Sequence, residues 1–182
     1  MSIAISVEAF SHLPDTEPFQ SETSVRKAYV AWRSDLLQQI CLHFGWRYAP
    51  WDEQHTRIIS ENDSLMWSTY QELYSLTQNV VQRSKANVFT HFLTRYDHGQ
   101  LAIYLPVVFD EPFLIERNIY PEKATIASAW RLSQELKALT EFLVNQEGVA
   151  MDNVEQARYA HELLSHFAKR SWELRCPLFL SW

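Results

Sequence analysis

The feature that most constrains the fold is a long stretch in which apolar residues recur at helical spacing. From about Glu22 to Phe44, they fall three to four positions apart, and an α-helix places such positions on one face. Ser21 or Thr23 can cap the start, and Gly45 can end the helix. The stretch therefore predicts one long amphipathic helix. Its expected inner face comprises Val25, Tyr29, Trp32, Leu36, Ile40 and Phe44, with Val30, Leu37 and Cys41 beside them.

Three further segments show the same spacing. A second helix is expected over about 64–85, after a cap at Asn62 or Asp63, and a third over about 123–147, before Gly148. A fourth begins at Asp152 and stops before Pro177. The inner faces expected are Met66, Tyr70, Leu73 and Val80; Ile126, Trp130, Leu136, Leu139 and Leu143; and Ala157, Ala160, Leu164, Phe167 and Trp172.

Between and beside the helices lie short β-favouring runs. Residues 2–8 alternate apolar and polar side chains, which predicts a strand, and 178–182 is apolar enough to dock as a terminal strand. Residues 57–59 and 113–115 are two further short strand candidates. The longest β-favouring region, 88–109, is predicted to form a hairpin that turns at Gly99.

The hairpin has a predicted register and one competing interpretation. Pairing position 92 with 105 puts Tyr96, Phe92, Leu101, Ile103, Leu105 and Val107 on one buried face. Pro106 lacks an N–H group, so the second strand should be at an edge or bulged there. In the alternative, the second helix continues through Tyr96, but the run 101–109 then loses its neighbouring strand.

Composition places the chain in a broad class. With 47% apolar and 21% charged residues it is not intrinsically disordered, and it has no apolar run long enough to span a membrane. There is no linker, low-complexity run or internal repeat, so we expect a single domain over 1–182. The predicted fold class is α+β: about four long helices packed on a small, mainly antiparallel sheet that contains the 88–109 hairpin.

Charge and glycine content exclude several functions. The chain carries 16 Lys and Arg against 22 Asp and Glu, a net charge of −6, which disfavours binding to nucleic acid. The chain has three glycines, too few and too far apart for a glycine-rich phosphate-binding motif, so we expect no nucleotide cofactor. The first basic residue, Arg26, follows four acidic ones, unlike secretory or organellar signals, which predicts a cytoplasmic protein. Cys41 and Cys176 are expected to be reduced.

Familiar catalytic and metal-binding patterns are missing. The segment from His161 to His166 resembles a zinc-protease helix motif, but its histidines are five residues apart and point about 140° away from each other. We therefore expect no metal there. Neither cysteine has a predictable histidine partner and no serine lies in a nucleophile elbow, so no catalytic residue is assigned.

Two clusters remain as binding candidates. Arg95, Tyr96, Asp97 and His98 gather a cation, a phenol, a carboxylate and an imidazole at the predicted hairpin tip. Asp97 could orient the imidazole of His98, although a tight turn selects Asp and Gly for backbone reasons alone. The second cluster is Trp46, Arg47, Tyr48 and Trp51. These residues lie in a connection outside the predicted helices and strands, so no buried face of such an element explains their aromatic side chains. They could line a pocket, bind a partner or form a lid on the core.

The sequence favours a binding protein over an enzyme. We expect a non-enzymatic, cytoplasmic protein-interaction domain that acts through an acidic and aromatic surface on another protein or on a second copy of itself. An inhibitor or immunity-like protein that neutralises a basic partner would fill this role. The alternative is a small-ligand-binding protein or enzyme that uses Asp97 and His98.

Overall fold

A computed structural model describes residues 2–12, 23–53, 58–84, 89–93, 101–116, 123–144 and 151–181. Within these ranges the chain forms six strands and four helices. The strands are β1 (Ser2–Val7), β2 (Ile58–Met66), β3 (Leu101–Leu105), β4 (Phe113–Glu116), β5 (Lys123–Ser128) and β6 (Leu178–Ser181). The helices are α1 (Thr23–Phe44), α2 (Trp67–Ser84), α3 (Ala129–Val144) and α4 (Met151–Leu174).

The strands belong to one sheet, in the order β2-β1-β6-β3-β5-β4. Neighbouring strands are antiparallel except β3 and β5, which run parallel. The first and last strands of the chain, β1 and β6, pair with each other inside the sheet. The predicted helix-rich α+β fold with a mainly antiparallel sheet is therefore confirmed, as are both terminal strands and the strand over 113–116.

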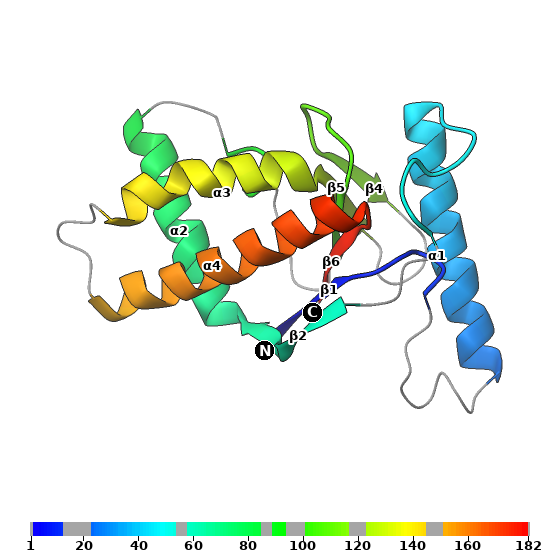
Figure 1. The fold of residues 1–182 in the computed structure, drawn as a ribbon, viewed down its shortest axis with the longest axis horizontal. Helices are drawn as coiled ribbons and strands as arrows, with labels where there is room; N and C mark the ends of the chain where they lie inside the picture. The colour runs from blue at the N-terminus through cyan, green and yellow to red at the C-terminus, as the bar shows by residue number, and fades with distance from the viewer. Residues whose placement is uncertain are drawn as a thin grey trace.

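Helices cover both faces of the sheet. Among the described elements, α2, α3 and α4 lie on one side of it and α1 lies on the other (Figure 1). Successive side chains of a strand point to opposite faces, so β3 contributes to both layers. Ala102 and Tyr104 join the core under α2–α4, whereas Leu101, Ile103 and Leu105 join the core under α1. All five are buried, as expected for a strand covered on both faces.

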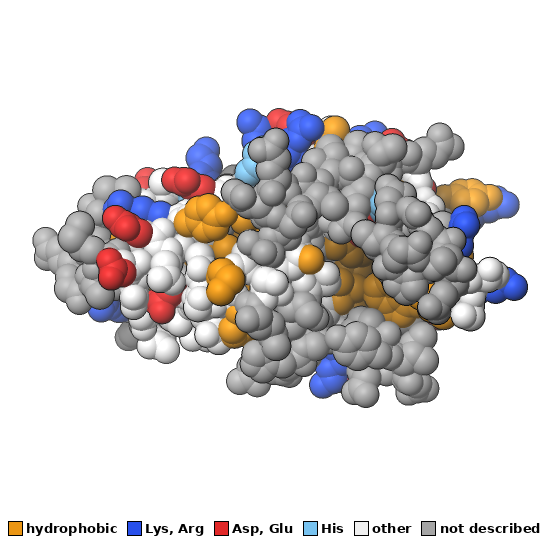
Figure 2. Space-filling view, turned by 90° about the horizontal axis from the view of Figure 1, so that it is seen from below, with side chains coloured by type: hydrophobic (Ala, Val, Ile, Leu, Met, Phe, Trp, Pro, Cys, Tyr) orange, Lys and Arg blue, Asp and Glu red, His pale blue; other side chains and the backbone are white. Residues whose placement is uncertain are grey.

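The core beneath α1 is the smaller one. Of the 22 residues of α1, the buried ones are Arg33, Leu36 and Ile40. Leu36 and Ile40 pack toward the sheet, but Val30 and Leu42 are 46% and 71% exposed. Seen from below, hydrophobic side chains are visible in a recess toward the end of the molecule where α1 lies (Figure 2). This side of the sheet is therefore incompletely covered by the described residues.

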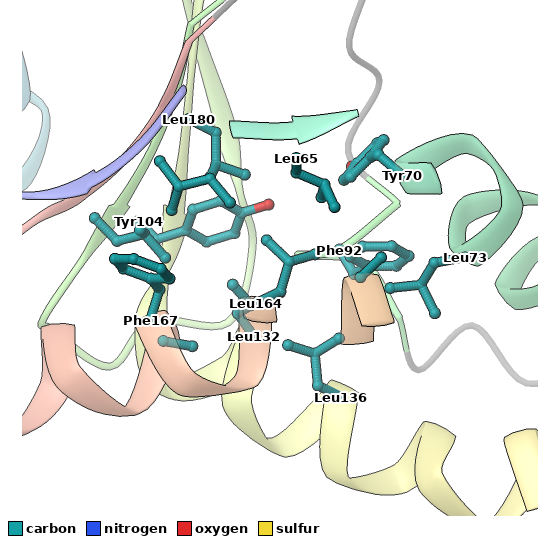
Figure 3. Close-up of a cluster of buried hydrophobic side chains, with 14 of the residues drawn as sticks. Leu65, Tyr70, Leu73, Phe92, Tyr104, Leu132, Leu136, Leu164, Phe167 and Leu180 are labelled. Carbon is teal, nitrogen blue, oxygen red and sulfur yellow. The ribbon is translucent and has the colours of Figure 1, made fainter. Parts of the chain in front are cut away.

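The larger core lies between the sheet and α2–α4. Tyr104 from β3 lies close to Phe167 of α4, and Leu132 and Leu164 join it from α3 and α4 (Figure 3). Burial of each such side chain contributes about 1.5–3 kcal/mol. Trp172 was expected on this inner face but is 41% exposed, because it follows Phe167 by five residues and points away from the stripe. No described helix has the length and hydropathy needed to cross a membrane.

Helix α1 ends as its sequence predicts. Gly45 adopts a positive φ of 69°. Its N–H donates to the Leu42 carbonyl at 3.2 Å, and the Trp46 N–H donates to the Cys41 carbonyl at 2.8 Å. These two bonds form a Schellman motif, which satisfies carbonyls at the helix end and for which glycine is favoured. The turn carries the chain from α1 into the aromatic segment that begins at Trp46.

Two helices start later than their apolar spacing predicts. Residues 64–66 continue β2, because they pair with β1 and place Leu65 in the core, and Met66 is left 55% exposed. Residues 123–128 form β5 between β3 and β4, and only then does α3 begin. The Ser128 Oγ accepts the Arg131 N–H at 3.3 Å, which caps α3. Strand pairing therefore overrides helical periodicity at both places.

The predicted 88–109 hairpin is wrong. Residues 89–93 form a turn, in which the Leu93 N–H donates to the Phe89 carbonyl at 2.9 Å. The neighbours of β3 are β5 and β6, and Leu105 pairs with Ser128 instead of position 92. Phe89 and Phe92, three positions apart, share one side of the turn and enter the core under α2–α4. The alternative, in which the second helix continues through Tyr96, is wrong too. Residues 89–93 form a turn and not a helix, and the described part of α2 ends at Ser84.

Candidate functional site

The aromatic segment after α1 is divided between core and surface. Trp46 stacks on Phe44 with ring centroids 4.1 Å apart, and Trp51 packs edge-on against Trp46 at 6.0 Å. Trp51 is 7% exposed, whereas Tyr48 is 73% exposed, with the guanidinium carbon of Arg47 at 5.3 Å from its ring. The two tryptophans thus close the end of the smaller core, and Arg47 and Tyr48 project from it.

The other cluster expected from the sequence lies outside the described residues. Arg95, Tyr96, Asp97 and His98 fall between residue 93 and β3, in the undescribed range 94–100. The hairpin that was to present them is not formed by the flanking residues. The hypothesis that Asp97 and His98 act together therefore stays a prediction.

The carboxylate of Glu53, just after the aromatic segment, is held in place by hydrogen bonds from Trp51 and Ser11. The Trp51 Nε1–H donates to its Oε1, and the backbone N–H of Ser11 donates to its Oε2 at 3.0 Å. The Ser11 hydroxyl donates in turn to the backbone carbonyl of Glu53. These bonds join the segment after β1 to the segment after α1 and hold the carboxylate in one orientation.

Beside Glu53, a buried ion pair links α1 to the end of β1. The Arg33 Nη1 donates to Glu8 Oε1 at 2.9 Å, and its Nη2 donates to the Ala9 carbonyl at 2.9 Å. The guanidinium carbon of Arg33 lies 4.2 Å from the ring centre of Phe179 and 5.4 Å from that of Tyr29. Arg33 and Glu8 are 2% and 5% exposed, so their charges neutralise each other largely out of water.

A cavity of about 250 Å³ lies between α1 and residues 10–12. We call it the α1 pocket. Its walls combine rings and aliphatic side chains with a few polar groups, an arrangement typical of ligand sites. The pocket is lined by Phe10, Ser11, His12, Tyr29, Val30, Ser34, Leu37 and Glu53.

The charges around the α1 pocket do not cancel. Glu8 is neutralised by Arg33, and Glu53 adds a second carboxylate on the pocket wall. His12 contributes an imidazole whose Nε2 lies 3.9 Å from Glu8 Oε2. With His12 counted as neutral, the formal charges of Glu8, Arg33 and Glu53 leave one net negative charge beside the pocket. The pocket is therefore suited to a positively charged or neutral group and would repel an anion.

A second polar cluster pins the 89–93 turn against α3 and β5. The Glu135 carboxylate accepts the backbone N–H groups of His91 at 3.0 Å and Phe92 at 2.7 Å. The His91 Nδ1 accepts the Ser128 N–H at 2.9 Å, and its Nε2–H donates to the Asp110 carbonyl at 3.0 Å. These partners require the neutral imidazole with its proton on Nε2. His91 therefore has a structural environment.

Burial shifts the pKa values of this pair in opposite senses. It raises the pKa of Glu135 to about 7, although the N–H groups of His91 and Phe92 and the charge of Arg131 act to lower it. Burial also lowers the pKa of His91 below its ordinary value of 6.5. Asp110 and Arg131 form an exposed ion pair beside them. The cluster holds the turn in place against α3 and β5.

The two histidines of α4 have separate environments. The His161 Nε2–H donates to the Leu136 carbonyl of α3 at 2.6 Å, whereas His166 is exposed beside Phe167. Across the described ranges, no three His, Cys, Asp or Glu side chains are grouped closely enough to hold a metal ion. Cys41 and Cys176 are both free thiols.

Sequence reasoning missed most of the residues of the α1 pocket. One signal was readable: Arg33 falls on the stripe of Tyr29, Leu36 and Ile40, so a charge had to be buried on that helix face. A buried arginine needs a carboxylate partner, but no local pattern points to Glu8, which is 25 residues away. Glu53 carries no signal, because only the fold brings it to Ser11.

Comparisons of the chain with protein-family models, curated proteins and solved structures find no significant match.

Proposed function

We propose that the protein is a non-enzymatic binding protein that holds a segment of another protein in the α1 pocket. The observation that carries the proposal is the Glu53 carboxylate, which lies on the wall of a largely apolar cavity with N–H donors on both of its oxygens. An apolar cavity with one oriented polar group suits recognition of a side chain projecting from a partner.

The surroundings of the pocket favour binding because they are already ordered. Arg33 is held by Glu8 and the Ala9 carbonyl, and its guanidinium lies over Phe179. Phe10 packs against both Phe179 and Trp51, at 5.2 Å and 5.9 Å between ring centroids. Side chains that are already fixed lose little conformational entropy when a partner binds, which raises affinity.

The role expected for the aromatic segment changes accordingly. Trp51 serves the site indirectly, because it holds Glu53 through its indole N–H while its ring is buried. Arg47 and Tyr48 are exposed in the same segment and are available to contact a larger partner. A partner protein therefore meets an aromatic and acidic surface, as the sequence predicts for a binding domain.

Selection of displayed random peptides on the immobilised protein tests this proposal. Ser34 is exposed and lines the pocket, so Ser34→Trp should fill the cavity and weaken the selected peptides by at least about tenfold. Ser24→Trp, on the same helix but away from the pocket lining, is the matched control and should bind like the wild type. Circular dichroism and melting temperature establish that both variants fold.

Two outcomes would overturn the proposal: no peptide is selected, or the selected peptides bind Ser34→Trp as tightly as the wild type. A second copy of the chain is the other partner that the sequence allows. Sedimentation velocity over a range of protein concentrations separates the two cases. If the wild type dimerises and Ser34→Trp is monomeric, the pocket serves self-association instead.

A further inference from the structure

The charge and the wall residues of the α1 pocket suit one kind of group on a partner, a cation. Glu53 adds a carboxylate to the wall, while the neighbouring Glu8 and Arg33 cancel each other's charge. The whole chain carries a net charge of −6, which attracts basic segments over longer distances. A carboxylate or phosphate on a partner would face repulsion at this site.

The walls of the pocket also suit a cation. Phe10 and Tyr29 both line it, and the guanidinium carbon of Arg33 lies 5.6 Å from the ring centre of Phe10. This distance lies within the range of about 6 Å at which an aromatic ring attracts a cation. The Arg33 Nη1 donates to the Tyr29 hydroxyl at 2.6 Å, so the wall already holds one guanidinium through a ring and a hydroxyl oxygen.

The remaining walls suit the stem of a long basic side chain. Val30 and Leu37 from α1 present aliphatic surface to the cavity, and Val30 is 46% exposed. Arginine and lysine carry their charge at the end of an aliphatic stem that packs readily on such surface. Apolar walls, aromatic rings and an oriented carboxylate together match the three parts of such a side chain.

We propose that the α1 pocket receives an arginine or lysine side chain of the partner segment, with its stem against Val30 and Leu37 and its charged head at Glu53. This inference rests on the proposed function, because it names the group that the partner inserts. Each oxygen of the Glu53 carboxylate has two lone pairs, so it can accept the partner's N–H groups in addition to those of Trp51 and Ser11.

The direct test uses small probes followed by two-dimensional NMR: Nα-acetyl-arginine amide, Nα-acetyl-lysine amide and the neutral isostere Nα-acetyl-citrulline amide. The two cationic probes should shift the amide signals of Ser11, His12 and Glu53 in a saturable way. Loss of a charge-assisted hydrogen bond should weaken citrulline by about tenfold or more. Raising the salt concentration should weaken only the charged probes.

Variants at Ser34 and Glu53 complete the test. Glu53→Gln should weaken the arginine probe by about tenfold, and Glu162→Gln, an exposed change on α4, should have no effect. Glu53 also bonds to Ser11, so Glu53→Gln could disturb the local structure. Substitutions at exposed Ser34 change the charge of the pocket and leave the bonds between Glu53 and Ser11 intact. Affinity for the arginine probe should rank Ser34→Glu above Ser34→Gln and Ser34→Gln above Ser34→Lys.

The inference is overturned if citrulline binds as well as arginine, or if affinity is independent of the charge at position 34. These failures are distinguishable from failure of the proposed function. If the selected peptides bind less tightly to Ser34→Trp but contain no essential basic residue, the proposed protein binding stands and only the inference of an inserted arginine or lysine fails.

Discussion

The two faces of the sheet are covered in different ways. On one face, α2, α3 and α4 bury an apolar core that includes Leu132, Leu164 and Phe167 (Figure 3). On the other face, α1 alone among the described helices covers the sheet, and one of its three buried residues is the charged Arg33. The first face is held mainly by packing, and the second by a smaller core together with a buried ion pair.

The difference in helix cover between the two faces bears on where a cavity can form. Interdigitated side chains under three helices fill the space between the layers, as close-packed protein interiors do. On the other face, within the described residues, a cavity of about 250 Å³ lies between α1 and residues 10–12. The polar bonds of Arg33 and Glu53 then orient the groups that surround the cavity. The face that is less completely packed is the one suited to binding.

The largest effect expected concerns packing. Leu164 and Leu36 are 1% and 0% exposed, on the α4 side and the α1 side respectively. Leu164→Ala should lower the free energy of unfolding by about 3–5 kcal/mol, and Leu36→Ala by about 2–3 kcal/mol, because the smaller core under the single helix α1 can collapse more easily around a deleted side chain. Urea unfolding measures both. Equal losses would mean that the two faces are packed equally well, and the comparison would fail.

The second prediction concerns the ion pair. Arg33→Met removes the arginine that neutralises the buried Glu8 carboxylate and should lower the free energy of unfolding by about 3 kcal/mol. Adding Glu8→Gln removes that charge and should restore about 1 kcal/mol or more. A double-mutant cycle from urea unfolding isolates this coupling. Strictly additive losses would show that the pair does not hold α1 to the sheet.

The smallest effect is a pH dependence on the α2–α4 face. Burial raises the pKa of Glu135 from 4.5 to about 7, so between these values the folded chain binds a proton that the unfolded chain releases. Its contribution to the free energy of unfolding therefore falls as the pH rises through that window. Glu135→Gln removes this dependence, which should amount to about 1–3 kcal/mol.

His91 acts in the opposite direction. Burial lowers its pKa below 6.5, so its contribution to stability is present above that pH and is lost as the pH falls through the lowered value. Urea unfolding from about pH 5 to about pH 8 compares wild type, Glu135→Gln and the exposed control Glu162→Gln. The unfolding free energy of wild type minus that of Glu135→Gln should decrease as the pH rises to about 7 and then level off. A constant difference would contradict the raised pKa of Glu135.

Sequence reasoning succeeded where structure is local. The helix over 22–44 is observed at Thr23–Phe44 and ends at Gly45, because helical spacing and the glycine signal lie within neighbouring residues. It failed for the hairpin, because β-favouring residues on both sides of Gly99 say nothing about more distant strands. Leu101 pairs with Ala124 and Ser181, which are 23 and 80 residues further along the chain.

The candidate site shows the same limit. The aromatic segment stays a candidate, and its sequence could not show that Trp51 is buried and donates its indole N–H to Glu53. Ser11 and Glu53 are 42 residues apart, and no pattern joins them. The buried arginine of α1 was the one part of the site that its helical position could have indicated.

By itself, the sequence determined the class of fold, the four helical regions and the acidic charge, since each follows from composition or from spacing within one segment. Only the tertiary structure decided the order of the strands, the turn at 89–93 and the α1 pocket. The physical reason is that backbone pairing and ion pairing join groups distant in the chain, and their free energy depends on positions that only the completed fold sets.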